Sequence, residues 1–163
     1  MLRVDQAGEY GATRIYAGQL AVLPSNCAEA KLIARMASQE ERHLKRFNAL
    51  MADRRVRPTA LQPFWNIAGF ALGAATALMS EKAALACTDA IETEIDRHYG
   101  EQLAELGEDD PELAGDIANF RAEELEHRDT AREAGATGVI GYPLLTAAIR
   151  AGCRVAIELS KRI

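Results

Sequence analysis

The sequence predicts an all-α protein of about six helices, and three observations support this prediction. Alanine and leucine dominate where β-branched residues would mark strands. No stretch alternates apolar and polar residues between turn signals, as a half-buried strand would. Prolines and glycines divide the chain into long segments that suit helices.

Length and composition set the first limits on function. A chain of 163 residues is long enough for one domain with a substantial core and too short for two independent units, so we predict a single domain over residues 1–163. The net charge of −5 argues against nucleic-acid binding, which needs a surplus of lysine and arginine on one face. The three cysteines lack the spacing of a zinc site or a disulfide framework, which suits a reducing compartment.

Three helices are predicted in the first half of the chain. The first spans Val4–Val22 and stops at Pro24, and the second spans Glu29–Asp53. The second ends before Pro58, because the residue that precedes a proline disfavours the helical conformation. After a short linker, the uncharged stretch Phe64–Met79 predicts an apolar helix.

Three more helices are predicted in the second half. An amphipathic helix spans Lys82–Leu106 and is followed by a break. Pro111 suits the first turn of the next helix, which runs to Ala134. A loop over Gly135–Pro143 leads to a last helix that ends near Arg162.

A motif of two ligand-type residues, Glu-x-x-His, occurs once in each half. It places its two side chains about 5–6 Å apart on one helical face, so both can reach a common ion. In each half, a glutamate of the preceding helix lies 31 or 32 residues before the motif, at matching height in an antiparallel hairpin. The six residues are Glu9, Glu40 and His43 in the first half, and Glu92, Glu124 and His127 in the second.

Packing the two hairpins together gives a four-helix bundle in which these six side chains are available to point inward. This ligand set is that of ferritin-like di-iron and di-manganese proteins. Two divalent ions balance the charge of four carboxylates, which would otherwise be costly to bury. Oxygen donors with two imidazoles suit iron or manganese better than zinc. We therefore predict a ferritin-like four-helix bundle with additional apolar helices and a dinuclear metal site.

Other polar residues near these six have simpler expected roles. Four acidic residues are expected on solvated faces: Glu41, Glu123, Glu126 and Asp129. Three more compete with Glu92 only if their helix is rotated: Asp89, Glu94 and Asp96. His98 and Tyr99 are candidates to support the ligands or to line a substrate pocket, with ordinary packing as the alternative. Asp5 is expected to cap the first helix.

The apolar helix Phe64–Met79 predicts contact with a membrane surface without a span. Its 16 residues reach about 24 Å, which is shorter than the ~30 Å hydrocarbon core of a bilayer. A basic cluster precedes it at the depth of anionic headgroups: Arg54, Arg55 and Arg57. The expected membrane contacts are Phe64, Trp65, Phe70 and Leu72. The alternative is a helix buried against the bundle or a partner chain, with a close-packing edge of Gly69, Gly73 and Ala77.

At these residues the chain resembles the demethoxyubiquinone hydroxylase family of ubiquinone biosynthesis. The resemblance spans nearly the whole chain and includes the pair Glu40 and His43. Its other segments are Arg3–Ala12, Asn66–Gly73, Ala86–Thr88, Glu123–His127 and Ala151–Ile157. It implies a di-iron monooxygenase that uses dioxygen to hydroxylate the ring of demethoxyubiquinone or its quinol, with electrons ultimately from NADH. It also implies that the six glutamates and histidines named above are the ligands of two iron ions.

The resemblance implies partners and a location as well. The substrate is a polyprenyl quinone, which resides in the bilayer, so a peripheral membrane protein is expected. The membrane is a bacterial inner membrane at its cytoplasmic face, or the mitochondrial inner membrane at its matrix face. A lipid-binding protein of ubiquinone biosynthesis is a further expected partner, and a homo-oligomer is compatible with the sequence. No strand, Gly-x-Gly-x-x-Gly turn and helix follow one another to bind NADH, so another nicotinamide contact, a partner protein or the quinone itself must deliver the electrons.

Two alternatives use the same residues. A ferritin-like iron-storage or peroxide-scavenging protein would share every ligand but would lack an exposed apolar helix for a polyprenyl substrate. A non-catalytic, membrane-bound quinone-binding scaffold would use the carboxylates for structure alone. A metal assay distinguishes the scaffold, and product analysis on demethoxyubiquinone distinguishes the storage protein.

Overall fold

The computed structural model describes residues 1–163 as six α-helices and one short 3₁₀ turn, without a strand. The helices are α1 (Leu2–Val22), α2 (Ala28–Asp53), α3 (Gln62–Met79), α4 (Glu81–Leu106), α5 (Pro111–Glu133) and α6 (Tyr142–Arg162), and the turn is η1 (Ala136–Gly138). The predicted all-α fold and the predicted number of helices are confirmed, and the helix ends lie close to those expected from the sequence.

Local side chains and one glycine set the ends of the central helices. Only Ser80 separates α3 from α4, and its hydroxyl accepts a hydrogen bond from the Ala83 N–H at 3.0 Å. Asp110 caps α5 in the same way by accepting from the Leu113 N–H at 3.2 Å. Gly107 ends α4 with a φ of +52°, in the backbone region that favours glycine. These caps fix the sharp turns that bring consecutive helices side by side.

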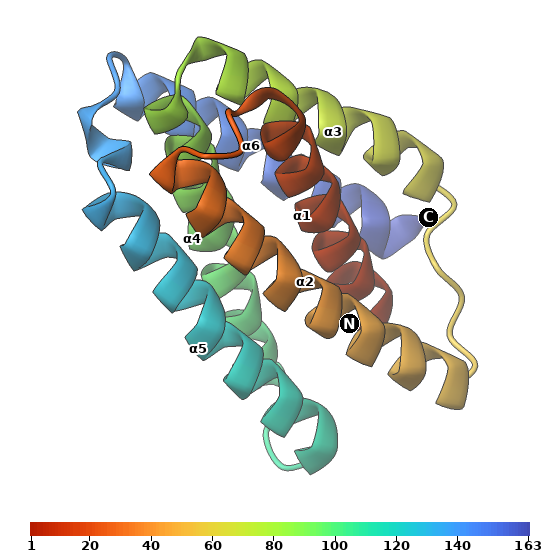
Figure 1. Cartoon of the computed structure of the whole chain (residues 1–163). Coiled ribbons are helices and arrows are strands. Elements are labelled where there is room, and N and C mark those ends of the chain that lie inside the picture. The colour runs from red at the N-terminus through yellow and green to blue at the C-terminus, as the bar shows by residue number, and fades with distance from the viewer.

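Four helices form the bundle and two helices flank it. α1 packs against α2, and α4 packs against α5. α3 then packs on α1, and α6 packs on α4. Figure 1 shows α2 and α5 on one side of the molecule and α3 on the other, with α1 between α2 and α3. Each half of the chain thus contributes one hairpin and one flanking helix.

The contact between α1 and α3 brings two backbones together. A Cβ atom on Gly73 would lie 1.9 Å from the carbonyl oxygen of Ile15, and one on Gly18 would lie 2.1 Å from the carbonyl oxygen of Phe70. Only glycine fits at either position unless a helix moves. The glycine edge that the sequence offered as an alternative for this helix is therefore the face that packs on the bundle.

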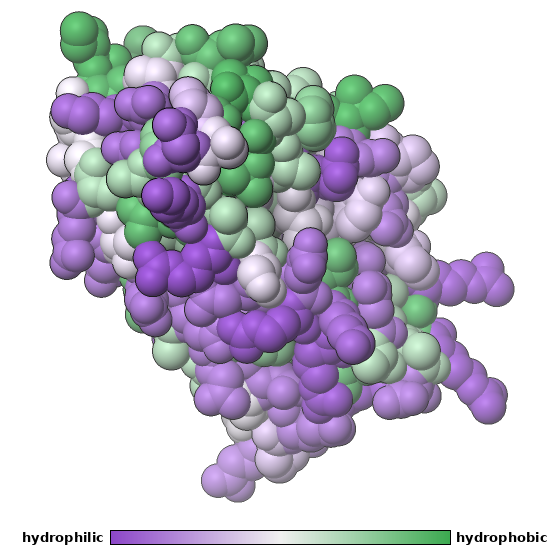
Figure 2. All heavy atoms as spheres, in the orientation of Figure 1, coloured by the Kyte–Doolittle hydropathy of each residue, from purple (hydrophilic) through white to green (hydrophobic).

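The opposite face of α3 is apolar and exposed. Phe64, Ile67 and Leu78 have exposed fractions of 59%, 72% and 74%. Figure 2 shows hydrophobic residues gathered along the edge of the molecule where α3 lies, whereas the region of α2 and α5 is mostly hydrophilic. None of the six helices combines the length and the apolar character that crossing a bilayer requires.

Ion pairs connect α2 to α5. Arg46 lies 2.7 Å from Asp116, and Arg54 pairs with Asp110. The sequence places Arg54 beside anionic headgroups, but in the folded chain its guanidinium is held by the Asp110 carboxylate. Because these pairs are partly exposed, they contribute more to the choice of helix partners than to overall stability.

Candidate metal centre

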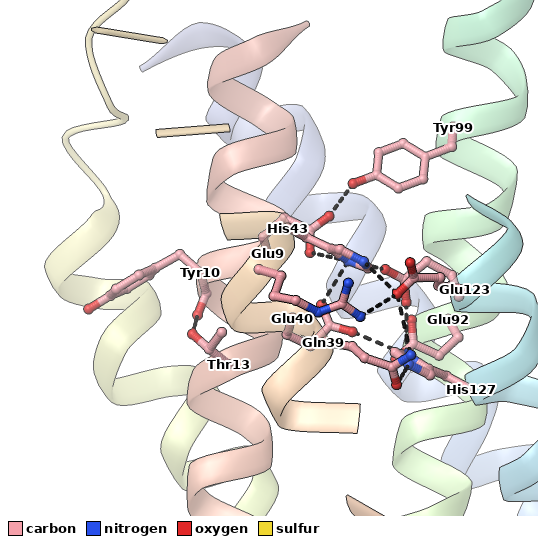
Figure 3. Close-up of polar contacts among 12 residues, drawn as sticks. Glu9, Tyr10, Thr13, Gln39, Glu40, His43, Glu92, Tyr99, Glu123 and His127 are labelled. Carbon is pink, nitrogen blue, oxygen red and sulfur yellow. Dashed lines mark hydrogen bonds and ion pairs between the residues drawn. The ribbon is translucent and has the colours of Figure 1, made fainter. Parts of the chain in front are cut away.

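Six buried side chains from four helices meet at the centre of the bundle (Figure 3). Each of them is at most 2% exposed. They are Glu9 from α1, Glu40 and His43 from α2, Glu92 from α4, and Glu124 and His127 from α5. The structure thus brings together all six residues that the sequence singles out as candidate ligands.

These residues form two overlapping groups, each able to hold one metal ion. The first group comprises Glu9, Glu40, His43 and Glu124, and the second comprises Glu40, Glu92, Glu124 and His127. Within each group, one ligand atom per residue lies within 4.8 Å of the others. Glu40 and Glu124 belong to both groups, which suits carboxylates placed between two ions.

The atoms that face the interior of this cluster have no hydrogen-bond partner outside it, and Nδ1 of each histidine lies 3.0–3.2 Å from carboxylate oxygens within it. They are Oε2 of Glu9 and Glu92, both carboxylate oxygens of Glu40 and Glu124, and Nδ1 of His43 and His127. A buried polar atom without a partner costs roughly 1–3 kcal/mol, so this set calls for a compensating ligand. Two divalent cations balance four carboxylates, and iron and manganese accept both oxygen and imidazole donors. The residues present therefore fit a dinuclear metal centre.

Burial and like charge disfavour four ionised carboxylates in one place. Burial, and then the charge of Glu124, raise the pKa of Glu40 and of Glu92 well above the usual range for glutamate. Burial opposes the charged form of His43, but the carboxylates of Glu124 and Glu9 beside its ring raise its pKa to about 10. Without a cation the cluster therefore retains protons, which metal binding must displace.

Two buried tyrosines connect the halves at the cluster. Tyr16 of α1 donates a hydrogen bond to Glu92 at 2.6 Å, and Tyr99 of α4 donates one to Glu9. Burial raises the pKa of both hydroxyl groups well above the usual tyrosine range, so both remain donors. Sequence reasoning misses Tyr16, although a signal exists. Each tyrosine lies seven residues after the glutamate of its own helix, which places the pair on one helical face.

The ring nitrogen of each histidine that faces away from the cluster contacts a residue of the other half (Figure 3). Nε2 of His43 lies 3.2 Å from a carboxylate oxygen of Glu123, and Nε2 of His127 lies 2.9 Å from the amide oxygen of Gln39. Glu123 is only partly solvated, with 29% of its side chain exposed, so the prediction of a solvated face misses its main contact: the carboxylate reaches across to α2 and contacts a histidine. The other three acidic residues of that prediction are exposed: Glu41, Glu126 and Asp129.

The three acidic residues of α4 that were alternatives to Glu92 as a ligand make contacts away from the cluster. Asp89 accepts hydrogen bonds from Arg132 of α5 and from the Tyr142 hydroxyl of α6. Glu94 is buried and accepts from three arginines: Arg97, Arg150 and Arg154. Asp96 accepts from an arginine of α5. α4 therefore presents a single carboxylate to the cluster.

His98 forms a further polar contact between α4 and α1. Its Nε2 lies 3.1 Å from the Asp5 carboxylate, to which Gln102 also donates at 2.8 Å. The expectation that Asp5 caps the first helix is wrong. The helix begins at Leu2 and has no side-chain cap, so Asp5 lies in its first turn and points into the bundle.

An apolar cavity of about 520 Å³ opens beside the cluster. It lies among α1, α3, α4 and α6, and most residues that line it are hydrophobic. Glu9, His98 and Tyr99 are among its polar lining residues, so the cavity reaches the cluster. Cys153 also lines it, and Cys87 belongs to the apolar cluster against which Cys153 packs.

The four predicted membrane contacts divide between this cavity and the surface. Trp65 and Leu72 line the cavity. Phe64 and Phe70 are exposed on the outer side of α3. One helix therefore borders both the cavity and the exposed apolar face.

A helical bundle with a buried carboxylate and histidine cluster able to bind two metal ions defines the ferritin-like class of proteins. Within this class, the family described as "Ubiquinone biosynthesis protein COQ7" matches residues 1–160. The chain belongs to this family.

Three similar proteins carry hydroxylase names. The chain is 55% identical over 162 residues to the "3-demethoxyubiquinol 3-hydroxylase" of Rhodospirillum rubrum. This match covers 99% of the chain and 76% of that protein. It is 52% identical over 167 residues to the "NADPH-dependent 3-demethoxyubiquinone 3-hydroxylase, mitochondrial" of Homo sapiens, and this match covers 100% of the chain and 76% of the human protein. It is 42% identical over 179 residues to the "5-demethoxyubiquinone hydroxylase, mitochondrial" of Saccharomyces cerevisiae, with 100% and 77% covered.

Proposed function

We propose that this protein is a di-iron monooxygenase that hydroxylates the ring of demethoxyubiquinone, or of its quinol, in ubiquinone biosynthesis. The observation that carries this proposal is the apolar cavity that reaches Glu9, one of the six cluster residues. Its volume of about 520 Å³ is in the range of sites that hold a small molecule, and a polyprenyl quinone needs an apolar site with few polar groups. The family and the names of the relatives support the same activity.

The six cluster residues would hold two Fe²⁺ ions. Bound iron supplies the reductive activation of dioxygen, which side chains alone cannot perform. Tyr16 and Tyr99 each bind one oxygen of a carboxylate, on Glu92 and Glu9, and leave the other oxygen free to face the ions. The two tyrosines thereby orient these ligands before any ion arrives.

The proposed reaction replaces one ring hydrogen of the substrate by a hydroxyl group. One atom of dioxygen enters the new C–O bond, and the other leaves as water after taking up two protons and two electrons. The hydrophobic lining of the cavity holds the apolar tail and excludes water from the reacting carbon. His98 and Tyr99 line the cavity, and Tyr99 donates to Glu9 of the cluster, so the polar ring would be placed beside these residues.

The two electrons are proposed to come ultimately from NADH. The name of the human relative states NADPH dependence for that protein, so both nicotinamides belong in the test. The sequence lacks the glycine-rich turn that usually binds a dinucleotide, so delivery through another nicotinamide contact, a partner protein or the quinone itself is part of the same proposal.

We further propose that the protein meets its substrate as a peripheral membrane protein. The exposed apolar face of α3 belongs to the helix whose Trp65 and Leu72 line the cavity, so a polyprenyl tail has a short apolar route inward. The proposed membrane is the cytoplasmic face of a bacterial inner membrane or the matrix face of the mitochondrial inner membrane. The proposal also includes binding to a lipid-binding protein of ubiquinone biosynthesis and assembly of the chain into a homo-oligomer.

Three alternative functions receive no support from the relatives. Iron storage, peroxide scavenging and a non-catalytic scaffold all conflict with names that describe hydroxylases. An iron-storage protein would also have no use for an apolar cavity that ends at its metal cluster.

Isotope labelling tests the proposed reaction. The full chain, loaded with Fe²⁺, receives ¹⁸O₂ and a demethoxyubiquinol with a short tail, with NADH and NADPH in separate reactions. We expect one ¹⁸O atom in the new hydroxyl group, and loss of product in Glu124→Ala. Glu126→Ala removes an exposed carboxylate from the same helix and should keep the activity.

Two outcomes would contradict the proposal. Label that appears only in water or peroxide, while iron is mineralised, would favour the storage and scavenging alternatives. Hydroxylated product made by the protein without iron would exclude the di-iron centre as its source.

A further inference from the structure

The two histidines of the cluster are supported by residues that occupy equivalent positions but differ in charge. Gln39 directly precedes Glu40, and Glu123 directly precedes Glu124, so both hold the same place before a Glu-x-x-His motif. Each reaches the histidine of the other half (Figure 3). His127 therefore faces a neutral amide, whereas His43 faces a carboxylate.

The tyrosine supports of the cluster are matched between the halves. Tyr16 and Tyr99 donate to Glu92 and Glu9, and each tyrosine stands seven residues after the glutamate of its own helix. The residues at positions 39 and 123, by contrast, differ in charge. The two metal sites are expected to differ electronically for that reason.

Hydrogen bonds join these supports into one chain across α2 and α5. The amide nitrogen of Gln39 donates to Oε2 of Glu123 at 3.3 Å, and Arg42 donates to the same oxygen at 3.0 Å. An ionised carboxylate only accepts hydrogen bonds, so the amide oxygen of Gln39 must turn to His127, and Nε2 of both histidines must carry the proton. Nδ1 of each histidine is then the ring nitrogen that faces the metal site, where metal binding displaces any proton that it carries.

We propose that Glu123 and Gln39 are positioning residues that make the two iron sites unequal in reduction potential. An imidazole N–H that donates to a carboxylate makes the ring a stronger electron donor, and a neutral amide does so less. The iron bound by His43 therefore keeps the ferric state more strongly. With two ferric ions bound, the site at His127 would therefore have the higher reduction potential and the site at His43 the lower one. This inference depends on the proposed metal centre, but it does not depend on the hydroxylation.

Stepwise reduction of the iron-loaded protein tests the inference. The purified full chain with two ferric ions is titrated with dithionite, and the mixed-valent form, with one electron per iron pair, is followed by electron paramagnetic resonance. The yield of this form gives its equilibrium constant against the fully oxidised and fully reduced forms. Unequal sites raise this constant, so making the supports equal should lower it on the order of tenfold.

Three variants and one control make the test specific. Glu123→Gln places amides behind both histidines, and Gln39→Glu places carboxylates there, so both should lower the yield of the mixed-valent form. The mean potential should rise in Glu123→Gln and fall in Gln39→Glu. The double swap Gln39→Glu/Glu123→Gln keeps one amide and one carboxylate in contact but exchanges their places. It should restore the wild-type yield and the wild-type mean potential. Glu126→Gln removes the same charge from an exposed position beside His127 that has no hydrogen bond to either histidine, and it should shift both values less than Glu123→Gln does.

Each result separates the inference from the proposed function. Unchanged yields and potentials in both single variants, with two irons bound, would overturn it and leave the metal centre standing. A shift in Glu126→Gln as large as that in Glu123→Gln would overturn it as well, because a general charge effect would then explain the data. A wild-type chain that binds no iron would overturn both the metal centre and this inference. If Glu123→Gln loses iron, the double swap provides the test. A wild-type yield of the mixed-valent form in the double swap would support the inference, and a lower yield would overturn it.

Discussion

The two halves of the chain place equivalent side chains around the metal centre but attach their third helix differently. α3 approaches α1 at backbone distance through Gly18 and Gly73. α6 is held to α4 by side chains, such as the pair of Arg150 with the buried Glu94. A Cβ atom on Gly152 of α6 would meet no atom within 4 Å, and this glycine lines the cavity. The comparison indicates that the repeat defines the cluster, while the looser attachment of α6 makes room for the cavity.

Removal of a shared carboxylate should have the largest effect, because it tests which ligands serve both halves. Glu40→Ala and Glu124→Ala each remove a residue of both metal groups, so both irons should be lost. Glu9→Ala and Glu92→Ala each affect one group, and one iron should remain. Iron analysis after gel filtration measures this, with Glu126→Ala as the control. Two irons retained in Glu40→Ala and Glu124→Ala would refute the ligand assignment.

A methyl group added at one glycine of each flanking helix compares how α3 and α6 are attached. Gly73→Ala forces a Cβ onto the Ile15 carbonyl oxygen, so the free energy of unfolding should fall by about 3 kcal/mol. Gly152→Ala fills open space in a helix and should raise it by up to about 1 kcal/mol. Urea denaturation of the two variants measures both values. Equal effects would show that the two contacts do not differ in closeness.

Charges on the exposed face of α3 should have a smaller effect, on membrane binding alone. Phe64→Asp/Ile67→Asp removes two exposed apolar side chains, and binding to vesicles of mixed neutral and anionic lipid should weaken at least tenfold. Flotation measures the bound fraction. Ala49→Asp/Ala52→Asp adds the same charge at the same spacing on exposed positions of α2 and should not change it.

The equivalent change on α6 sharpens the comparison of the two halves. Val155→Asp/Leu159→Asp alters exposed apolar residues of the second flanking helix. If only the α3 variant loses binding, the first half carries the membrane contact. Binding that survives the α3 variant in a folded protein would exclude α3 as the contact.

Patterns along single helices made the fold and the six cluster residues predictable. Side chains that bind one ion must share a face, and the spacing of Glu40 and His43 reports that face directly. The contact of Glu123 with His43 was not predictable in the same way, because it depends on how α2 and α5 are rotated against each other. Asp5 was misplaced for a simpler reason, since the first helix begins earlier than its apolar pattern suggests.

The supports of the cluster could have been found by comparing the halves with each other. Tyr16 and Tyr99 stand at the same distance from their glutamates, and Gln39 and Glu123 stand at the same place before their motifs. Equivalent positions in the two halves of the bundle both lie next to the cluster, so a polar residue at both positions indicates a role there. The charge difference between the last two residues acquires a meaning only when each is seen against the opposite histidine.

The sulfur atoms beside the cavity bear on the durability of the protein. Burial raises the pKa of Cys87 and of Cys153 to about 12. At pH 7 only about one thiol in 10⁵ is then the thiolate, which is the form that reacts with peroxide. A pocket proposed to admit dioxygen and a reducible quinone therefore holds its cysteines in their least oxidisable form. Escaped oxidants would find few reactive thiolates there, so the two cysteines should stay reduced over many turnovers.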